Sequence, residues 1–195
     1  ELSGDQDGAM KDYNEGISVD EDYPYIYLMR GSLYLEKGEM EKAMTDFETV
    51  VAKDTTVEDG SCRHYALNFL GKTEEALEWM EKIIELDPDD PGNWYDKACL
   101  LARMNRCDEA VSALRTSFEK GFRKFPHVDH DNDMDPIRDR DDFQALMQQY
   151  RKMLEQEVLT IGKDLDESAG KVVSEIEMKK MYGGTYEIPC FVNGL

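Results

Sequence analysis

The chain has 195 residues, of which 41% are apolar and 34% are charged, a length and composition typical of a core-bearing domain plus an extra segment. Its formal net charge of −20 argues against a nucleic-acid-binding surface, because phosphate binding requires clustered Lys and Arg. No apolar run approaches the roughly 20 residues of a membrane span, so the sequence predicts no membrane-spanning helix.

Seven helices are predicted in the first part of the chain. Glu, Lys, Leu, Met and Ala are frequent, and these residues lose little on entering a helix. Gly38 and Gly71 occupy matching turns, and the prolines of Asp-Pro at 87–88 and Asp-Pro-Gly at 90–92 separate two helices. The predicted helices lie near residues 5–18, 24–37, 40–53, 57–70, 73–86, 91–104 and 107–120. The first has no partner helix, so we expect further sequence upstream of Glu1.

An internal repeat underlies these helices. Four alanines recur at intervals of 34, 33 and 34 residues, and a large apolar residue follows each of them one helical turn later. The alanines are Ala9, Ala43, Ala76 and Ala110, and the large residues are Tyr13, Phe47, Met80 and Leu114. We expect each alanine to let the second helix of a pair approach the first, and each large residue to fill the core between them.

One unit carries a nearly complete motif. Tyr27, Gly31 and Tyr34 precede Ala43 and Phe47 at the spacings of the aromatic, glycine and tyrosine positions of the tetratricopeptide repeat. The chain therefore resembles proteins of the tetratricopeptide repeat family. This resemblance implies an all-α fold in which helix pairs stack as a right-handed superhelix, here over residues 1–157 as a partial first repeat, three repeats and an irregular capping unit. Residues 158–171 are predicted to be a linker or a helix extension.

The acidic segment at residues 127–136 has two interpretations. Alternating carboxylates could surround a hard cation, but Met134 or Pro136 stands where a calcium loop requires glycine. We therefore expect Asp133 or Asp135 to cap a helix, Pro136 to occupy its first turn, and Arg138 to pair with a neighbouring carboxylate. The sequence predicts no metal site and no other cofactor.

The cysteines and histidines do not indicate catalysis. Cys62, Cys99, Cys107 and Cys190 show no metal-binding spacing, so we expect thiols inside or beside the core. A disulfide between Cys62 and Cys99, which fall in the first helices of neighbouring repeats, is the alternative. The three histidines have no Ser or Cys partner in a nucleophile motif, so the chain as given is not predicted to be an enzyme.

In tetratricopeptide proteins the first helix of each pair lines the concave groove, and the resemblance implies a peptide-binding site there. The candidate groove residues are Tyr25, Leu28, Ser32, Tyr65, Asn68, Phe69, Tyr95 and Arg103. Chaperone-binding members of the family hold a terminal carboxylate with Lys, Asn and Arg, but Leu28 and Ser32 stand at two of these positions. A neutral or basic, apolar-containing protein or peptide is therefore the predicted partner, although the same side chains could pack against a neighbouring helix instead.

The C-terminal residues 172–195 have a different pattern, which predicts a short β-hairpin around Gly183-Gly184. Residues 186–189 and 192–194 resemble the opening hairpin of the bacterial retropepsin-like aspartic protease domain. In that family an Asp-Thr-Gly motif follows, and this sequence ends at Leu195 before any such motif. We expect an exposed hairpin edge to promote self-association.

The predicted function is a protein–protein interaction scaffold that binds a peptide or protein segment in the concave groove. The alternative is the non-catalytic repeat region of a retropepsin-like aspartic protease, which would position substrate or a partner. The sequence predicts a soluble protein, and its start without Met is compatible with export to the bacterial periplasm after removal of a signal.

Overall fold

The computed structural model describes residues 5–57, 61–169, 179–180 and 186–187, with side chains described as far as Thr160. It divides into two compact units, Glu1–Phe122 and Arg123–Leu195. The boundary lies at the point where the 34-residue register is lost, within the single solenoid that the sequence predicts over residues 1–157.

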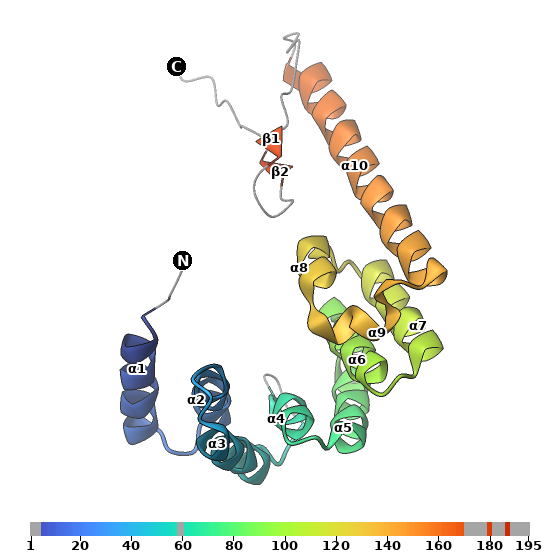
Figure 1. Cartoon of the computed structure of the whole chain (residues 1–195). Coiled ribbons are helices and arrows are strands. Elements are labelled where there is room, and N and C mark those ends of the chain that lie inside the picture. Colours follow the sequence, from blue (N-terminus) through green and yellow to red (C-terminus); the bar gives the residue numbers. More distant parts are fainter. Residues whose placement is uncertain (1–4, 58–60, 170–178, 181–185, 188–195) are drawn as a thin grey trace, which may run out of the picture. The chain divides into compact units, whose positions relative to one another are not determined.

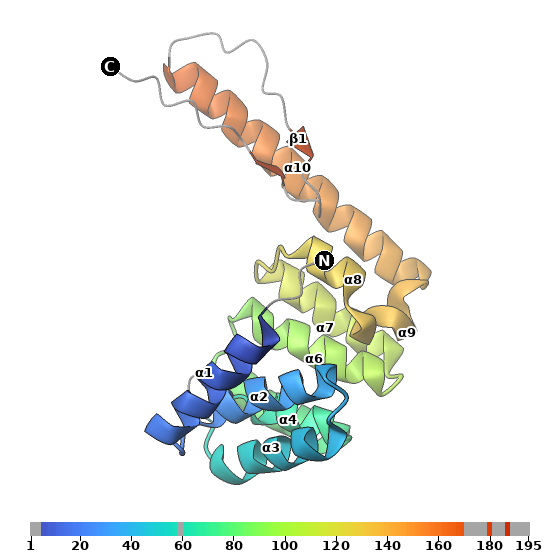
Figure 2. The same cartoon turned by 60° about the vertical axis from the view of Figure 1, so that its left-hand side comes forward.

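Helices build the described part of the first unit, and each packs beside the next one in the chain (Figures 1 and 2). These helices are α1 (Gln6–Val19), α2 (Pro24–Glu36), α3 (Met40–Lys53), α4 (Arg63–Phe69), α5 (Thr73–Leu86), α6 (Pro91–Arg103) and α7 (Cys107–Glu119). All the predicted helices are present, and the bounds of all but α4 agree with prediction within one residue. The right-handed twist of the array stays a prediction.

The late start of α4 is the one substantial departure, and Asp54 explains it. The buried Asp54 carboxylate accepts hydrogen bonds from the backbone N–H groups of Cys62 and Arg63, at 2.7 and 2.9 Å, and so caps the helix from the end of α3. The Arg63 guanidinium donates in return to the carbonyls of Val51 and Asp54. Because this exchange satisfies groups at the ends of two helices, the helix begins at Arg63 and not near residue 57.

Burial confirms the alanine register in three of the four units, whereas Ala9 and Tyr13 in α1 are half-buried. The residues with no exposed surface at the repeated positions are Ala43, Phe47, Ala76, Met80, Ala110 and Leu114. Gly31 has the role expected for a close helix contact, since a Cβ atom built there would lie 2.7 Å from the Phe47 ring. The pairing of small and large residues therefore sets the distance between α2 and α3.

The turns after α2, α4 and α6 share one backbone conformation. Gly38 and Gly71 both have φ of +74°, and Asn105, at the same place in the third turn, has φ of +55°. In each turn the following residue donates its N–H to a carbonyl five residues earlier, as in the bond from Glu39 to Tyr34 at 2.8 Å. Asparagine tolerates this left-handed conformation, which is why the third turn needs no glycine.

A buried ion pair connects the first three helices. Arg30 in α2 donates from Nε and Nη2 to the two carboxylate oxygens of Asp46 in α3, at 2.8 and 2.7 Å, and from Nη1 to Asn14 in α1 at 2.8 Å. Hydrogen bonding to Asp46 raises the pKa of the Arg30 guanidinium above its ordinary value. Since a buried charge is costly without a partner, the pair fixes the orientation of these helices.

The second unit contains short helical segments followed by one long helix. They are α8 (Phe125–His130), the 3₁₀ helix η1 (Asn132–Met134), α9 (Asp135–Arg138) and α10 (Asp141–Ala169). The core of this unit includes Val128, Met134 and Ile137, which have no exposed surface. Because α10 continues to Ala169, the described part of the predicted linker or helix extension is helical.

The acidic segment serves helix capping, as expected, but a different aspartate provides the cap. The Asp131 carboxylate caps η1 by accepting from the backbone N–H of Asp133 at 2.9 Å, and α9 has no side-chain cap. Pro136 lies in the first turn of α9, and Arg138 pairs with Asp135 at 2.9 Å, as predicted. Arg138 also donates to the backbone carbonyls of Val128, Asp129 and Asp131, so it closes the loop before α9.

The prediction of a C-terminal β-hairpin as part of the fold is wrong. In that region the structure describes only β1 (Lys179–Lys180) and β2 (Tyr186–Glu187), two residues each, paired antiparallel. Strands of globular proteins usually have about 3–10 residues, and an isolated pair is marginal, so this ladder adds no β-layer to the helical fold. The other residues of 172–195, including most of the segment that resembles the protease hairpin, lie outside the described residues.

Candidate functional site

The predicted groove residues differ in accessibility. Tyr25, Tyr65 and Phe69 expose 45%, 40% and 42% of their surface, and Arg103 is also exposed. Ser32 and Asn68 are half-buried, whereas Leu28 and Tyr95 are buried. Most of the predicted residues are therefore accessible to a ligand at least in part, whereas Leu28 and Tyr95 lie in the core.

The two buried positions belong to the core. Leu28 lies in the cluster that contains Phe47 and Val50. The Tyr95 ring stacks on Phe122, with the centroids 4.5 Å apart and the planes 7° from parallel. Both side chains thus support the first helices from inside, and sequence pattern alone did not separate them from their exposed neighbours.

Two positions in α2 bear on the predicted absence of a carboxylate clamp. Ser32 Oγ donates to the Leu28 carbonyl in its own helix at 2.9 Å, which engages the hydroxyl proton within α2. Leu28 is apolar and buried. Neither residue presents a cation to a ligand, so α2 lacks at these positions the groups that would hold a terminal carboxylate.

Exposed tyrosines and one aspartate connect the first helices of three consecutive pairs. Tyr23, at the start of α2, lies beside Tyr25 with ring centroids 6.3 Å apart. Tyr65 in α4 donates its hydroxyl to an oxygen of Asp96 in α6 at 2.5 Å. We call Tyr23, Tyr25, Tyr65 and Asp96 the tyrosine–aspartate patch.

Burial and Asp96 determine the protonation of Tyr65. Burial of its hydroxyl raises the pKa of the Tyr65 phenol, and the charge of Asp96 and the hydrogen bond to it raise the pKa further. The charges of Cys99 and Tyr25 raise the pKa of the phenol by smaller amounts. The phenol therefore stays protonated and remains a donor to Asp96.

His64 lies beneath the patch. It is 4% exposed, and neither ring nitrogen has a hydrogen-bond partner in the part of the chain that the structure describes. Its Nε2 atom is 3.6 Å from the Asp96 carboxylate, beyond hydrogen-bonding distance. Tyr23, His64 and Asp96 were not among the sequence candidates, although Asp96 follows the predicted Tyr95 directly.

Phe69 extends the apolar part of the face along α4. One side of its ring stacks on Phe47 of α3, with centroids 4.6 Å apart and planes 10° from parallel. The ring is nevertheless substantially exposed. Its position is fixed by the core, so it offers a rigid aromatic surface.

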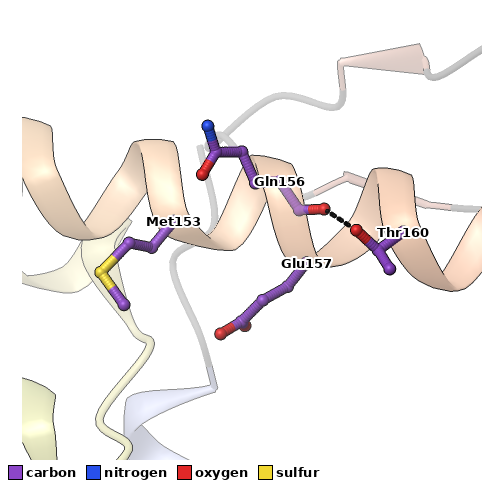
Figure 3. Close-up of a pocket in the computed structure, with 4 residues that line it drawn as sticks. All are labelled: Met153, Gln156, Glu157 and Thr160. Carbon is purple, nitrogen blue, oxygen red and sulfur yellow. Dashed lines mark hydrogen bonds between the residues drawn. The ribbon is translucent and has the colours of Figure 1, made fainter.

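Other places on the molecule offer less. A hollow on α10 is lined by Met153, Gln156, Glu157 and Thr160 (Figure 3). Thr160 donates its hydroxyl to the Gln156 carbonyl at 2.9 Å, a bond within the helix (Figure 3). Among the described residues, no group of three His, Cys, Asp or Glu side chains could hold a metal ion, and no helix is long and apolar enough to cross a membrane.

The comparison with known families identifies the repeat. Residues 2–38 match the family described as "TPR repeat", and residues 65–90 match the family described as "Tetratricopeptide repeat". The chain carries tetratricopeptide repeats. In this repeat the first helices are α2, α4 and α6, on which the tyrosine–aspartate patch lies.

Curated relatives also carry this repeat name. The "TPR repeat-containing protein MJ1428" of Methanocaldococcus jannaschii is 29% identical over 131 residues, which are 58% of this chain and 23% of that protein. The "Tetratricopeptide repeat protein 14" of Mus musculus is 27% identical over 115 residues, or 58% of this chain and 14% of that one. The matched part of the chain thus spans less than a quarter of the length of either relative.

A solved structure shares the fold. The "MamA RS-1 ArsTM double mutant" aligns with a TM-score of 0.51 at 15% identity, covering 80% of this chain and 86% of that one. At this identity the likeness shows the fold alone. The family matches and this structural likeness support an all-helical tetratricopeptide solenoid, to which the two-residue strands β1 and β2 do not belong.

Proposed function

We propose that this chain is a protein-interaction scaffold whose first helices bind a neutral or basic peptide or protein segment. The observation that carries the proposal is the tyrosine–aspartate patch, which brings exposed aromatic rings from α2 and α4 together with a carboxylate from α6. Tetratricopeptide repeats support a scaffold role in general. The choice of these helices and of this ligand class is our own inference.

Aromatic side chains suit such a surface for a physical reason. Tyrosine contributes a large apolar area and a polar end while having few rotatable bonds, so its immobilisation on binding costs little. Tyr25 and Tyr65 lie on separate helices of the scaffold, and each helix is held by its neighbours. A ligand that crosses the first helices would contact both rings.

The charge of the molecule determines the preferred ligand. The net charge of −20 creates a negative field that opposes acidic ligands and favours the approach of basic ones. Leu28 and Ser32 offer no cation for a carboxylate. A neutral or basic segment with apolar side chains is therefore favoured over an acidic chaperone tail.

Peptide display with the full chain tests the proposal. We expect Tyr25→Ala and Tyr65→Ala each to weaken binding of the selected peptides by about tenfold, as for an aromatic hot spot. Tyr95→Ala is unsuitable because its ring is buried.

Leu86→Ala is the matched control, because Leu86 is an exposed apolar residue on a second helix, α5. Circular dichroism melts should show that all three variants fold. Selection of acidic peptides, or equal loss of binding in Leu86→Ala and the tyrosine variants, would contradict the proposal.

The aspartic protease alternative stays a prediction. It depends on residues 186–189 and 192–194, of which the structure describes only Tyr186 and Glu187. No contact of the described residues favours it over the scaffold.

A further inference from the structure

Asp96 has an incompletely satisfied carboxylate. An ionised carboxylate can accept several hydrogen bonds, but in the described part of the chain Asp96 accepts one, from Tyr65. Lys97, its neighbour in α6, pairs with Glu81 of α5 at 3.0 Å and not with Asp96. No Lys or Arg of the described residues forms an ion pair with Asp96, whose side chain remains 23% exposed.

The buried His64 is an independent sign that this cluster lacks a partner. Both of its ring nitrogens are without hydrogen bonds among the described residues, although buried polar groups are nearly always satisfied. Its Nε2 atom points to the Asp96 carboxylate from 3.6 Å. A ligand group that donates hydrogen bonds to Asp96 would therefore lie close to both groups that lack partners, the Asp96 carboxylate and the His64 ring.

An exposed aromatic residue lies at the same carboxylate. Tyr65 donates its hydroxyl to Asp96 at 2.5 Å, and the charge of Tyr25 also contributes to the raised pKa of the Tyr65 phenol. A cation beside aromatic rings gains from their negative faces, and a cation at a carboxylate forms charge-assisted hydrogen bonds. Both effects favour the binding of an ammonium or guanidinium group, and both disfavour the binding of a carboxylate.

We propose that Asp96, positioned by Tyr65 above the buried His64, is the site at which the first helices select a Lys or Arg side chain of the ligand. The inference rests on the proposed function and adds the chemical group that is recognised. Tyr25 and Tyr65 contact the stem or the face of that side chain. Asp96 accepts its N–H groups.

The test uses nonapeptide libraries that share random flanking residues and differ in one fixed central residue. The central residue is Arg, Lys, citrulline, norleucine or Glu. Citrulline has the shape of Arg without its charge, and norleucine has the stem of Lys without its amine. Binding of each labelled library to the full chain is measured by fluorescence anisotropy at low salt, where charge effects are largest.

We expect the parent to bind the Arg and Lys libraries about tenfold better than the citrulline and norleucine libraries, as for a charge-assisted contact. Asp96→Asn should reduce this ratio severalfold, to the part that the overall negative charge supplies, while leaving norleucine binding unchanged. Asn still offers a carbonyl oxygen to the Tyr65 hydroxyl. Glu41→Gln, an equal change of charge at an exposed position of α3, should keep the parent ratio.

The outcomes separate the two proposals. A basic preference that is as large in Asp96→Asn as in Glu41→Gln would overturn the role of Asp96 and leave the scaffold intact. Absence of binding by every library would refute the proposed function and, with it, this site. An unchanged circular dichroism melt of Asp96→Asn excludes misfolding as the reason for a lost preference.

Discussion

At the scale of single residues, the contacts between paired helices depend on small side chains. Gly31 and Ala43 lie where α2 meets α3, and a Cβ on Gly31 would meet the buried Phe47 ring. Ala76 occupies the equivalent position in α5. At these sites side-chain volume, and not polarity, determines what the fold accepts.

Larger side chains at the repeat alanines should therefore destabilise the protein. We expect Ala43→Leu and Ala76→Leu each to lower the free energy of unfolding by about 1–3 kcal/mol, because added methylene groups have no space in a close-packed contact. Glu41→Ala, at an exposed position of the same helix as Ala43, should change it little. Urea unfolding followed by circular dichroism measures the difference, and equal midpoints for all variants would contradict the assigned register.

The cysteines are a second property of single residues. Cys62 and Cys99 are buried free thiols and Cys107 is a half-buried one, as the sequence indicated, and no disulfide joins Cys62 to Cys99. Burial raises the pKa of the Cys62 thiol to about 12, with further contributions from the charge and hydrogen bond of Asp54. The thiolate, which is the reactive form, is therefore scarce at neutral pH.

Cys62 should resist alkylation in the folded protein. At pH 8.5 we expect iodoacetamide to modify Cys62 much more slowly than in urea, with peptide mass spectrometry identifying the modified residue. Because the folded state holds this proton to a higher pH than the unfolded state, the associated stability is present below pH 9 and is lost as pH rises toward 12. Rapid modification of Cys62 in the native protein would show that its thiol is not buried.

At the scale of the elements, side chains from outside a helix determine where α4 begins. The Asp54 carboxylate holds two backbone N–H groups at its start, and Ser61 also donates to Asp54, at 3.1 Å. The Ser61 hydroxyl accepts in turn from Trp79 Nε1 of α5 at 2.8 Å. This network connects the end of α3 to the start of α4 and to the next helix.

Removal of the Asp54 carboxylate should loosen the start of α4. We expect Asp54→Ala to lower the free energy of unfolding by about 1–2 kcal/mol, the usual cost of losing a helix cap. Hydrogen exchange at the Cys62 and Arg63 amides should become faster. Asp12→Ala, at an exposed position of α1, is the control. Unchanged exchange at both amides would show that Asp54 does not cap the helix.

At the scale of the whole molecule, excess negative charge opposes the compact state. The net charge is −20, and many of the ion pairs are exposed, such as Lys53 with Asp22 at 2.7 Å and Lys120 with Asp89 at 2.8 Å. Exposed pairs contribute little, about 0–1 kcal/mol each. Repulsion among the unpaired carboxylates should therefore be the larger electrostatic effect.

Salt should then stabilise this protein. We expect the melting temperature to rise when NaCl is increased from about 10 to 300 mM, because screening weakens repulsion between distant carboxylates. The buried pair of Arg30 and Asp46 should be screened less than the exposed pairs. A melting temperature that falls with added salt would mean that attractive surface pairs outweigh the repulsion.

The sequence by itself determined the helices and their pairing. A period of 34 residues with alternating small and large side chains permits few other arrangements, because each helix pair must bury one apolar face against its neighbour. Burial therefore followed the register at Ala43, Phe47, Ala76 and Met80. The cap at Asp131 was not predicted, because several neighbouring aspartates could have provided it. The turn at Asn105 was not predicted, because it lacks the usual glycine.

Only the tertiary structure decided which residues of the first helices are available to a ligand. Tyr65 and Tyr95 were both predicted to line the groove, but Tyr65 is exposed whereas Tyr95 is buried and stacks on Phe122. The meeting of Asp96 with Tyr65 and His64 was likewise not visible in the sequence. A repeat pattern specifies which face of a helix meets its own partner, whereas contacts between one pair and the next depend on side-chain volumes and on small rotations that spacing does not record.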